Sequence, residues 1–199
     1  MGSALSKPVG RSTESPMKTF RFLSKLLLVA MTAALLPAIA WAADRGALER
    51  DARAALQKLT NAVPAAKSLS TSATAVLVFP KVTKAGLGVG GQYGDGVLFR
   101  QGKVAGYYNT SGASFGLQAG AQQFGYAMFL MNDKAVDALN ANEGFEVGVG
   151  PSVVVIDQGA AKSVTTTTAK DDIYAFIFGQ KGLMAGLGIQ GNKITSLKK

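Results

Sequence analysis

Glycine alternating with aliphatic residues is the feature that most restricts how this chain can fold. Residues 85–90 read Ala-Gly-Leu-Gly-Val-Gly, and glycine accounts for 24 of the 199 residues. A two-residue period is typical of a β-strand, whose successive side chains point to opposite faces. Glycine inside a strand marks a bulge, a tight bend or the close approach of another backbone. The pattern therefore predicts a sheet that is strongly curved or closes into a partial barrel.

Short strands are expected along most of the chain after Ala73. They are predicted at residues 74–79, 85–90, 97–100, 104–109, 146–149, 152–157, 163–168, 173–178 and 183–189. A turn is expected around Gly94–Gly96, and a tight hairpin turn at Gln101–Lys103.

One long segment changes the phase of its alternation. Apolar side chains fall on odd positions from Phe115 to Ala121 and on even positions from Phe124 to Leu130. Because a shift of one residue moves every side chain to the other face of a strand, this change predicts a β-bulge or sharp bend at Gln122-Gln123.

Three helices accompany the strands. The first is expected from Asp44 to Val63, where apolar residues recur at helical spacing before Pro64 ends the helix. A second, short helix is expected at residues 65–71, and a third from Asn132 to Ala141. The fold class is therefore α+β: an N-terminal helix followed by a Gly-rich, strongly curved antiparallel sheet or partial barrel with one interrupting helix.

The N-terminal region has the order of a secretory signal. Lys18 begins a basic stretch, an apolar run covers residues 26–36, and Ala40-Trp41-Ala42 offers a small-residue cleavage site. Cleavage is expected after Ala42 or Ala43. The alternative is an uncleaved anchor, because the 18 residues from Leu26 to Ala43 are mostly apolar, which is marginal for a membrane span.

Three segments follow from this interpretation. Residues 1–16 are a disordered upstream extension or the product of a start codon assigned too early, residues 17–42 are a signal peptide, and residues 43–199 form a single domain. Export would make the protein periplasmic, or peripherally attached to the outer membrane.

The missing residue types exclude several kinds of chemistry. The chain has no cysteine and no histidine, so it lacks a thiolate nucleophile, the usual general base near neutral pH and the commonest metal ligand. Two matches to G-x-G-x-x-G, at 86–91 and 186–191, are not followed by the helix that a dinucleotide site needs. We therefore expect no enzymatic activity, no cofactor and no metal site.

Positive charge favours an anionic partner. The formal charge is +9, and removal of residues 1–43, with five basic side chains and one acidic, leaves +5. The candidate lipid-binding residues are the basic side chains of the first helix and of the segments that follow: Arg45, Arg50, Arg53, Lys58, Lys67, Lys81, Lys84, Arg100 and Lys103. Several such contacts with an anionic membrane would be needed, since each contributes about 1 kcal/mol. No basic run is interleaved with aromatic residues, so nucleic acid is not an expected partner.

Two alternatives stay open for the first helix. Its basic side chains, with acidic residues among them, are equally consistent with an ordinary solvated face. Its apolar side, with Leu48, Leu56 and Leu59, would enter the headgroup layer of a membrane or pack on the domain's own core.

Ordered glycine blocks resemble the core of SYLF domains. The blocks that carry the likeness are residues 73–80, 85–98, 106–109, 116–122 and 179–186, within a span of residues 45–196. The resemblance implies a lipid-binding module without catalytic residues. Eukaryotic members associate with phosphoinositides and, in some cases, with actin. Thr74 departs from the pattern, since many members carry lysine there, and this weakens any transfer of a basic headgroup patch.

The sequence thus supports two functions. The first is a non-enzymatic phospholipid-binding domain that associates with anionic membrane surfaces of the bacterial envelope. The alternative is a structural or protein-interaction module of the envelope, which would bind a protein partner through sheet edges or through aromatic residues such as Tyr107, Tyr108 and Phe115.

Overall fold

The computed structural model describes residues 44–141, 144–156, 170–182, 189 and 191–197. The expected upstream extension and signal peptide lie outside these residues, as do the strand at 163–168 and nearly all of the strand at 183–189. The chain divides into two compact units, Met1–Asp44 and Arg45–Lys199, and the second is described below. Its described helices are all too short or too polar to cross a membrane.

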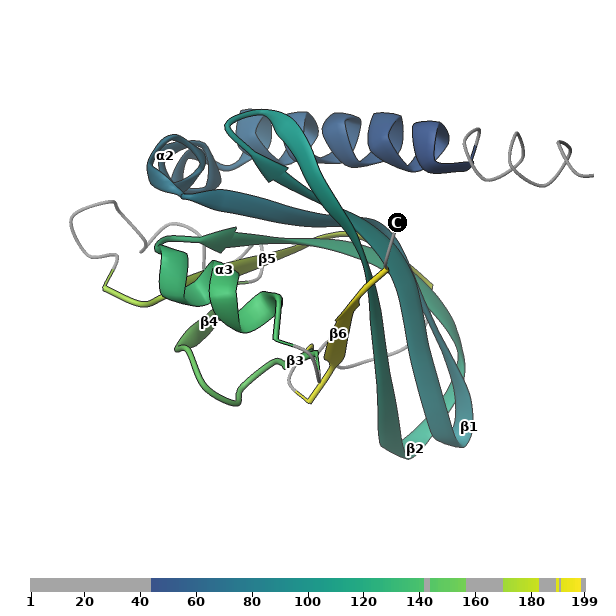
Figure 1. Cartoon of the computed structure of the whole chain (residues 1–199). Helices are drawn as coiled ribbons and strands as arrows, with labels where there is room; N and C mark the ends of the chain where they lie inside the picture. Colours follow the sequence, from purple (N-terminus) through teal and green to yellow (C-terminus); the bar gives the residue numbers. More distant parts are fainter. Residues whose placement is uncertain (1–43, 142–143, 157–169, 183–188, 190, 198–199) are drawn as a thin grey trace, which may run out of the picture. The chain divides into compact units, whose positions relative to one another are not determined.

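Two helices at the start of this unit cover one face of the sheet (Figure 1). The first, here called the opening helix, continues to residue 62. The second, α2 (Pro64–Ser72), carries Pro64 in its first turn, where a backbone N–H has no helical partner to lose. Both predicted helices are confirmed.

The apolar side of the opening helix packs on the sheet. Ala52 and Leu59 are fully buried in a cluster that includes Phe129, and Leu48 and Leu56 are partly buried against the same cluster. This packing decides between the two alternatives for these leucines. The domain's own core covers them, so they are not an apolar anchor for a membrane.

A single long hairpin forms the centre of the sheet. β1 (Ala75–Arg100) and β2 (Lys103–Leu130) are antiparallel, and Gln101 and Gly102 join them with φ angles of 51° and 74°. Positive φ at both positions is what a two-residue hairpin turn of type I′ requires, so the predicted hairpin is confirmed. The turn expected at Gly94–Gly96 is wrong, because these glycines pair with residues 108–110 inside the ladder.

The hairpin folds back on itself near its middle. A Cβ atom on Gly86 would lie 2.3 Å from the Cα of Gly90, and one on Gly94 would lie 2.7 Å from the carbonyl oxygen of Lys81. The two halves of β1 therefore touch where only glycine leaves room. We call residues 86–90 the bend. In Figure 1 the bend lies at the end of the sheet away from the opening helix, and the expected strong curvature is confirmed.

Register shifts accompany the curvature. The pairing of β2 with β5 (Ile173–Gly182) shifts between Gln123 and Gly125, which confirms the bulge predicted from the phase change. Another shift, between Phe79 and Val82 of β1, surrounds Pro80. Proline cannot donate a ladder hydrogen bond, so an irregular position is where a strand tolerates it.

The remaining described strands complete a mixed sheet. They are β3 (Phe145–Glu146), β4 (Val153–Ile156) and β6 (Lys193–Ser196). The order is β3-β6-β2-β5-β4, with β1 beside β2. β4 runs parallel to β5, which corrects the expectation of a wholly antiparallel sheet. β6 was not predicted.

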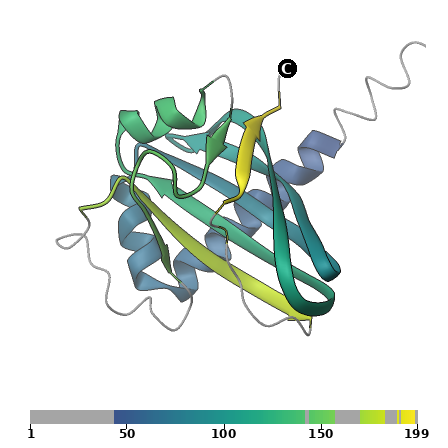
Figure 2. The same ribbon diagram turned by 90° about the horizontal axis from the view of Figure 1, so that it is seen from below.

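Each face of the sheet has its own apolar core. The opening helix and α2 cover one, and α3 (Asp133–Leu139) covers the other. The Oδ1 atom of Asn132 accepts a hydrogen bond from the backbone N–H of Ala135 at 2.9 Å, so the predicted cap of α3 is confirmed. Figure 2 shows α3 and the first two helices on opposite sides of the strands.

Candidate functional site

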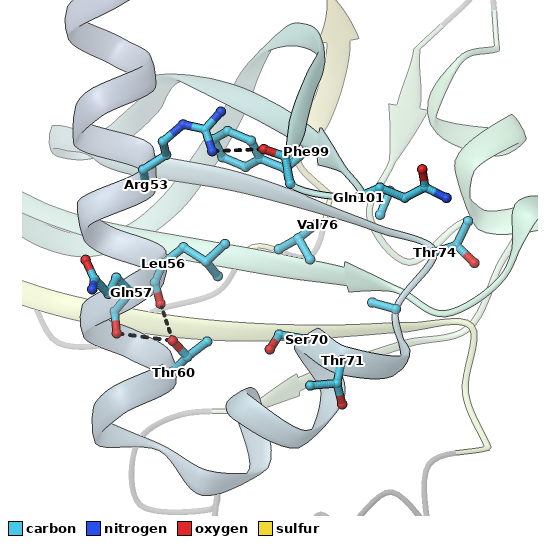
Figure 3. A pocket seen from close by; sticks show the side chains of 13 residues that line it. Arg53, Leu56, Gln57, Thr60, Ser70, Thr71, Thr74, Val76, Phe99 and Gln101 are labelled. Carbon is cyan, nitrogen blue, oxygen red and sulfur yellow. Dashed lines mark hydrogen bonds between the residues drawn. The ribbon is translucent and has the colours of Figure 1, made fainter.

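A cleft of about 570 Å³ lies between the opening helix, α2 and the turn end of the β1–β2 hairpin (Figure 3). Small-molecule sites have volumes of roughly 300–1,000 Å³. Residues from 53 to 102 line the cleft, so the cleft is complete only when both helices are packed on the hairpin.

Arg53 is the charged residue of the cleft wall. Its guanidinium carbon lies 4.7 Å from the ring centroid of Phe99, and its Nη1 donates a hydrogen bond to the carbonyl oxygen of Gly102 at 2.9 Å. The ring and the carbonyl fix the plane of the guanidinium, whose remaining donors stay available. Within the described part of the chain, Arg53 forms no ion pair with a carboxylate.

Arg45 makes a similar contact further along the opening helix. Its guanidinium carbon lies 4.8 Å from the ring centroid of Tyr107 on β2. The hydroxyl of Tyr107 donates a hydrogen bond to a carboxylate oxygen of Glu49, and this bond raises the pKa of the phenol. Two arginines on one helix thus stack on one aromatic ring from each strand of the hairpin, which fixes the helix that forms the cleft wall.

Hydroxyl groups surround the mouth of the cleft. The hydroxyls of Thr60, Ser70 and Thr71 each donate to a backbone carbonyl of their own helix, at distances of 2.7–3.1 Å. Each of these oxygen atoms keeps the capacity to accept a further hydrogen bond. Figure 3 shows these residues on the two helices, across from the hairpin.

Apolar side chains form the floor. Leu56 of the opening helix lies beside Val76 and Phe99 of β1, and all three belong to the core on this face of the sheet. The cleft therefore combines one fixed cationic group, several hydroxyl acceptors and an apolar floor. That combination suits an amphiphile with a negatively charged polar end.

Most of the predicted basic residues lie around the cleft rather than in it. Arg50 and Lys58 are exposed on the opening helix, and Lys67 is exposed on α2. Arg100 and Lys103 flank the hairpin turn as a cross-strand pair.

One of the predicted basic residues forms a salt bridge and another is buried. A nitrogen of Arg100 lies 2.8 Å from a carboxylate oxygen of Asp133, so this guanidinium is partly neutralised. Lys81 and Lys84 lie on the first half of β1, towards the bend. Lys84 is only 4% exposed, so a surface role for it is wrong: its side chain lies inside the folded-back hairpin.

Two of the three aromatic residues proposed for protein binding make contacts within the domain itself. Tyr108 is buried, and its hydroxyl donates to Oδ1 of Asn140 at 2.7 Å. Tyr107 is held by Arg45 and Glu49, and the side chain of Phe115 lies outside the described residues.

No metal centre accompanies the cleft. The side chains that the structure describes contain no cluster of three or more histidine, cysteine, aspartate or glutamate residues that could hold an ion. The cleft offers a guanidinium and hydroxyl groups, which suit the binding of a polar anionic group.

A comparison with protein families identifies the C-terminal half. The family model Ysc84, described as Las17-binding protein actin regulator, matches residues 111–199. The matched segment is consistent with the SYLF resemblance of the glycine blocks. The match begins in β2 and ends beyond β6, so the cleft lies N-terminal to the matched segment. A search of curated proteins finds no match to the chain.

Sequence reasoning found Arg53 but missed the rest of the cleft. Thr60, Ser70, Thr71 and Phe99 carry no motif of their own. The run Ser-Leu-Ser-Thr-Ser at 68–72 was the available signal, because hydroxyl residues are unusually dense there for a helix. Their meeting with Phe99 depends on tertiary packing.

Proposed function

We propose that this chain is a SYLF-like, non-enzymatic phospholipid-binding module whose cleft takes an anionic headgroup. The observation that supports this proposal is the arrangement of Arg53 and the helix hydroxyls above an apolar floor. A phospholipid presents matching chemistry, with a phosphate and polar hydroxyls at one end and acyl chains at the other.

Each part of the headgroup has a complementary group. The free donors of Arg53 suit phosphate oxygens, which guanidinium binds with charge-assisted hydrogen bonds. The acceptor oxygens of Ser70 and Thr71 suit hydroxyl groups, because hydroxyls donate hydrogen bonds. Phosphatidylglycerol combines a single negative phosphate with glycerol hydroxyls, so it is the headgroup that the cleft fits best.

Exposed basic residues around the cleft add attraction to an anionic surface. Arg50, Lys58, Lys67 and Lys103 are exposed there, and each contributes about 1 kcal/mol near an acidic bilayer. Asp51 lies among them and reduces the sum. The surface therefore concentrates the protein on the membrane, while the cleft supplies selectivity.

The proposed site of action is the bacterial envelope. The basic stretch, apolar run and Ala-x-Ala order before residue 43 support export. Phosphate headgroups face the periplasm from both membranes, so the protein would act in the periplasm or at the inner surface of the outer membrane.

Co-sedimentation with vesicles tests the proposal, using phosphatidylcholine alone and an equal mixture with phosphatidylglycerol. We expect the wild-type chain to bind the mixture only, and Arg53→Gln to weaken binding about tenfold or more, because it loses a charge-assisted contact of roughly 1.5–3 kcal/mol. Arg50→Gln is the matched control. It removes the same charge three residues away, and about 1 kcal/mol there corresponds to roughly fivefold.

Three results would contradict the proposal. The wild-type chain could bind neither vesicle, or bind both equally, or lose the same affinity with either arginine variant. Saturable binding to a protein partner, indifferent to lipid and salt, would instead support the interaction-module alternative, in keeping with the matched family's description as Las17-binding.

A further inference from the structure

The bend exposes large apolar side chains to solvent. Leu87 is 82% exposed and Val89 is 62% exposed. Small residues lie on either side of this pair, since Ala85 and Gly91 are exposed on the same face of the strand. Tyr93, two residues further, is 58% exposed. From Ala85 to Gly91 the outer face of β1 is therefore apolar.

The opposite face of the same strand is polar and buried. Lys84 and Gln92 are buried inside the fold-back, and so is Gln122 of β2, whose Oε1 atom has no hydrogen-bond partner among the described residues. Gln92 donates from Nε2 to Oδ1 of Asn192. A half-buried strand normally turns its apolar face inward and its polar face to water. At the bend this order is reversed.

Reversed alternation is expected where the outer surface meets an apolar medium. Exposing leucine and valine to water contributes nothing to the fold, and burying amide groups inside costs stability unless they are hydrogen-bonded. A bilayer would cover the outer face. Tyr93 would then lie at the edge of the covered region, where a ring with a polar end suits the membrane interface.

Charge around the bend suits an anionic bilayer. Asp95 is the one acidic residue of the sequence from Thr74 to Asn132; it lies next to Tyr93, at the edge of the exposed apolar stretch. Lys181 of β5 is exposed opposite Gln123, which pairs with Thr83 of β1. Four residues of strand separate Thr83 from Leu87, about 13 Å at 3.3 Å per residue. Lys181, which lies level with Thr83 across the strands, would therefore be at the depth of the headgroups when Leu87 enters the acyl chains.

We propose that the bend inserts Leu87 and Val89 into an anionic bilayer, as a membrane contact separate from the cleft. This inference rests on the proposed function for the choice of phospholipid as partner. It also supplies the apolar anchor that the opening helix cannot provide, because the leucines of that helix pack on the core. The bend and the opening helix lie at opposite ends of the sheet (Figure 1), so a lipid held in the cleft and a bilayer held by the bend are distinct contacts.

A fluorescence experiment tests insertion directly. Trp41 is the only tryptophan of the chain and lies in the expected signal peptide, so Trp41→Phe gives a dark background whether or not that segment is removed. Leu87→Trp in that background places a probe at the bend. Val149→Trp is the matched control, because Val149 is 61% exposed and lies away from the bend, just after β3. We expect vesicles that contain phosphatidylglycerol and brominated acyl chains to quench and blue-shift the first probe but not the second.

A binding experiment measures what the bend contributes. Leu87→Ser combined with Val89→Ser should weaken co-sedimentation with the phosphatidylglycerol mixture by about tenfold or more, since each side chain loses much of its burial in the acyl layer. Val149→Ser should leave it unchanged. All these side chains are exposed, so circular dichroism and thermal unfolding should match the wild-type chain.

The outcomes separate this inference from the proposed function. If the wild-type chain binds no vesicle, the proposed function fails. Suppose instead that the wild-type chain binds and Arg53→Gln weakens binding. If the Leu87→Ser/Val89→Ser variant then binds as tightly as the wild-type chain, and the two tryptophan probes respond equally to vesicles, only the insertion of the bend is refuted. A bend variant that changes the oligomeric state and leaves vesicle binding unchanged would show that a second copy covers this face, which also overturns the inference.

Discussion

The fold-back of the hairpin makes Gly94→Ala a sharp test of the architecture. A Cβ at this position would lie 2.7 Å from the carbonyl oxygen of Lys81, 2.8 Å from Cγ2 of Val82 and 3.0 Å from its Cα. Ordinary contacts of a Cβ begin near 3.4 Å. Two of the three neighbouring atoms are backbone atoms in a paired strand, so relief requires the two halves of β1 to separate.

The expected cost follows from this overlap. Extra atoms in a well-packed interior destabilise by about 1–3 kcal/mol. For a domain near 150 residues each kcal/mol lowers the melting temperature by roughly 2–4 °C, so we expect a decrease of roughly 2–12 °C. Backbone strain does not contribute, because φ at Gly94 is not in the left-handed region.

Gly91→Ala is the matched control on the same strand. Gly91 is exposed, and the nearest atom to a Cβ there is the carbonyl oxygen of Gly112 at 3.8 Å. The same substitution should be neutral or stabilise by about 0.4–1 kcal/mol, since it restricts only the unfolded chain. Denaturant unfolding of both variants gives the comparison. Equal midpoints for Gly94→Ala and Gly91→Ala would refute the described contact between the halves of β1.

Two further predictions concern the helical face and a surface carboxylate. Leu59→Ala should lower the free energy of unfolding by about 2–5 kcal/mol, because Leu59 is buried in the core; unchanged stability with weaker vesicle binding would show that it contacts lipid instead. The hydrogen bond that Asp172 accepts from Asn132 at 2.8 Å, followed by that from the backbone of Ser152, lowers the pKa of Asp172 below its ordinary 3.8. A lowered pKa stabilises the fold above the ordinary value, and this stabilisation is lost as pH falls through the lower folded value. Asp172→Asn should therefore show a shallower loss of melting temperature in that acid range, and an unchanged acid slope would contradict the assignment.

Local signals predicted much of the secondary structure. The cap at Asn132, the hairpin at Gln101–Gly102 and the phase change at Gln122-Gln123 each depend on a few neighbouring residues. These features could be predicted because helix caps, two-residue turns and bulges each have their own residue preferences. The signal at Gly94–Gly96 was misread for the same reason. Glycine is typical both of turns and of strands that another backbone approaches. Only the tertiary contact of Gly94 with Lys81 and Val82, in the first half of β1, shows that the second explanation applies here.

The cleft depends on contacts that no local pattern contains. Arg53 was found because a basic residue on an amphipathic helix is conspicuous. Its partners Phe99 and Gly102 lie 46 and 49 positions later in the sequence, and their meeting follows from packing of the opening helix on the hairpin. The hydroxyls at positions 60, 70 and 71 come together because α2 turns back beside the opening helix (Figure 3).

The bend shows most clearly what alternation can and cannot establish. A period of two indicates that Leu87 and Val89 share one face of the strand, and that Lys84 and Gln92 share the other. It does not indicate which face is inside, and the usual rule would bury the aliphatic pair. The glycines decide the opposite outcome. Because the glycines let the two halves of β1 approach closely, Lys84 and Gln92 are enclosed on the inner face, and the aliphatic side chains are left outside. A medium that favours them there is what the proposed insertion supplies.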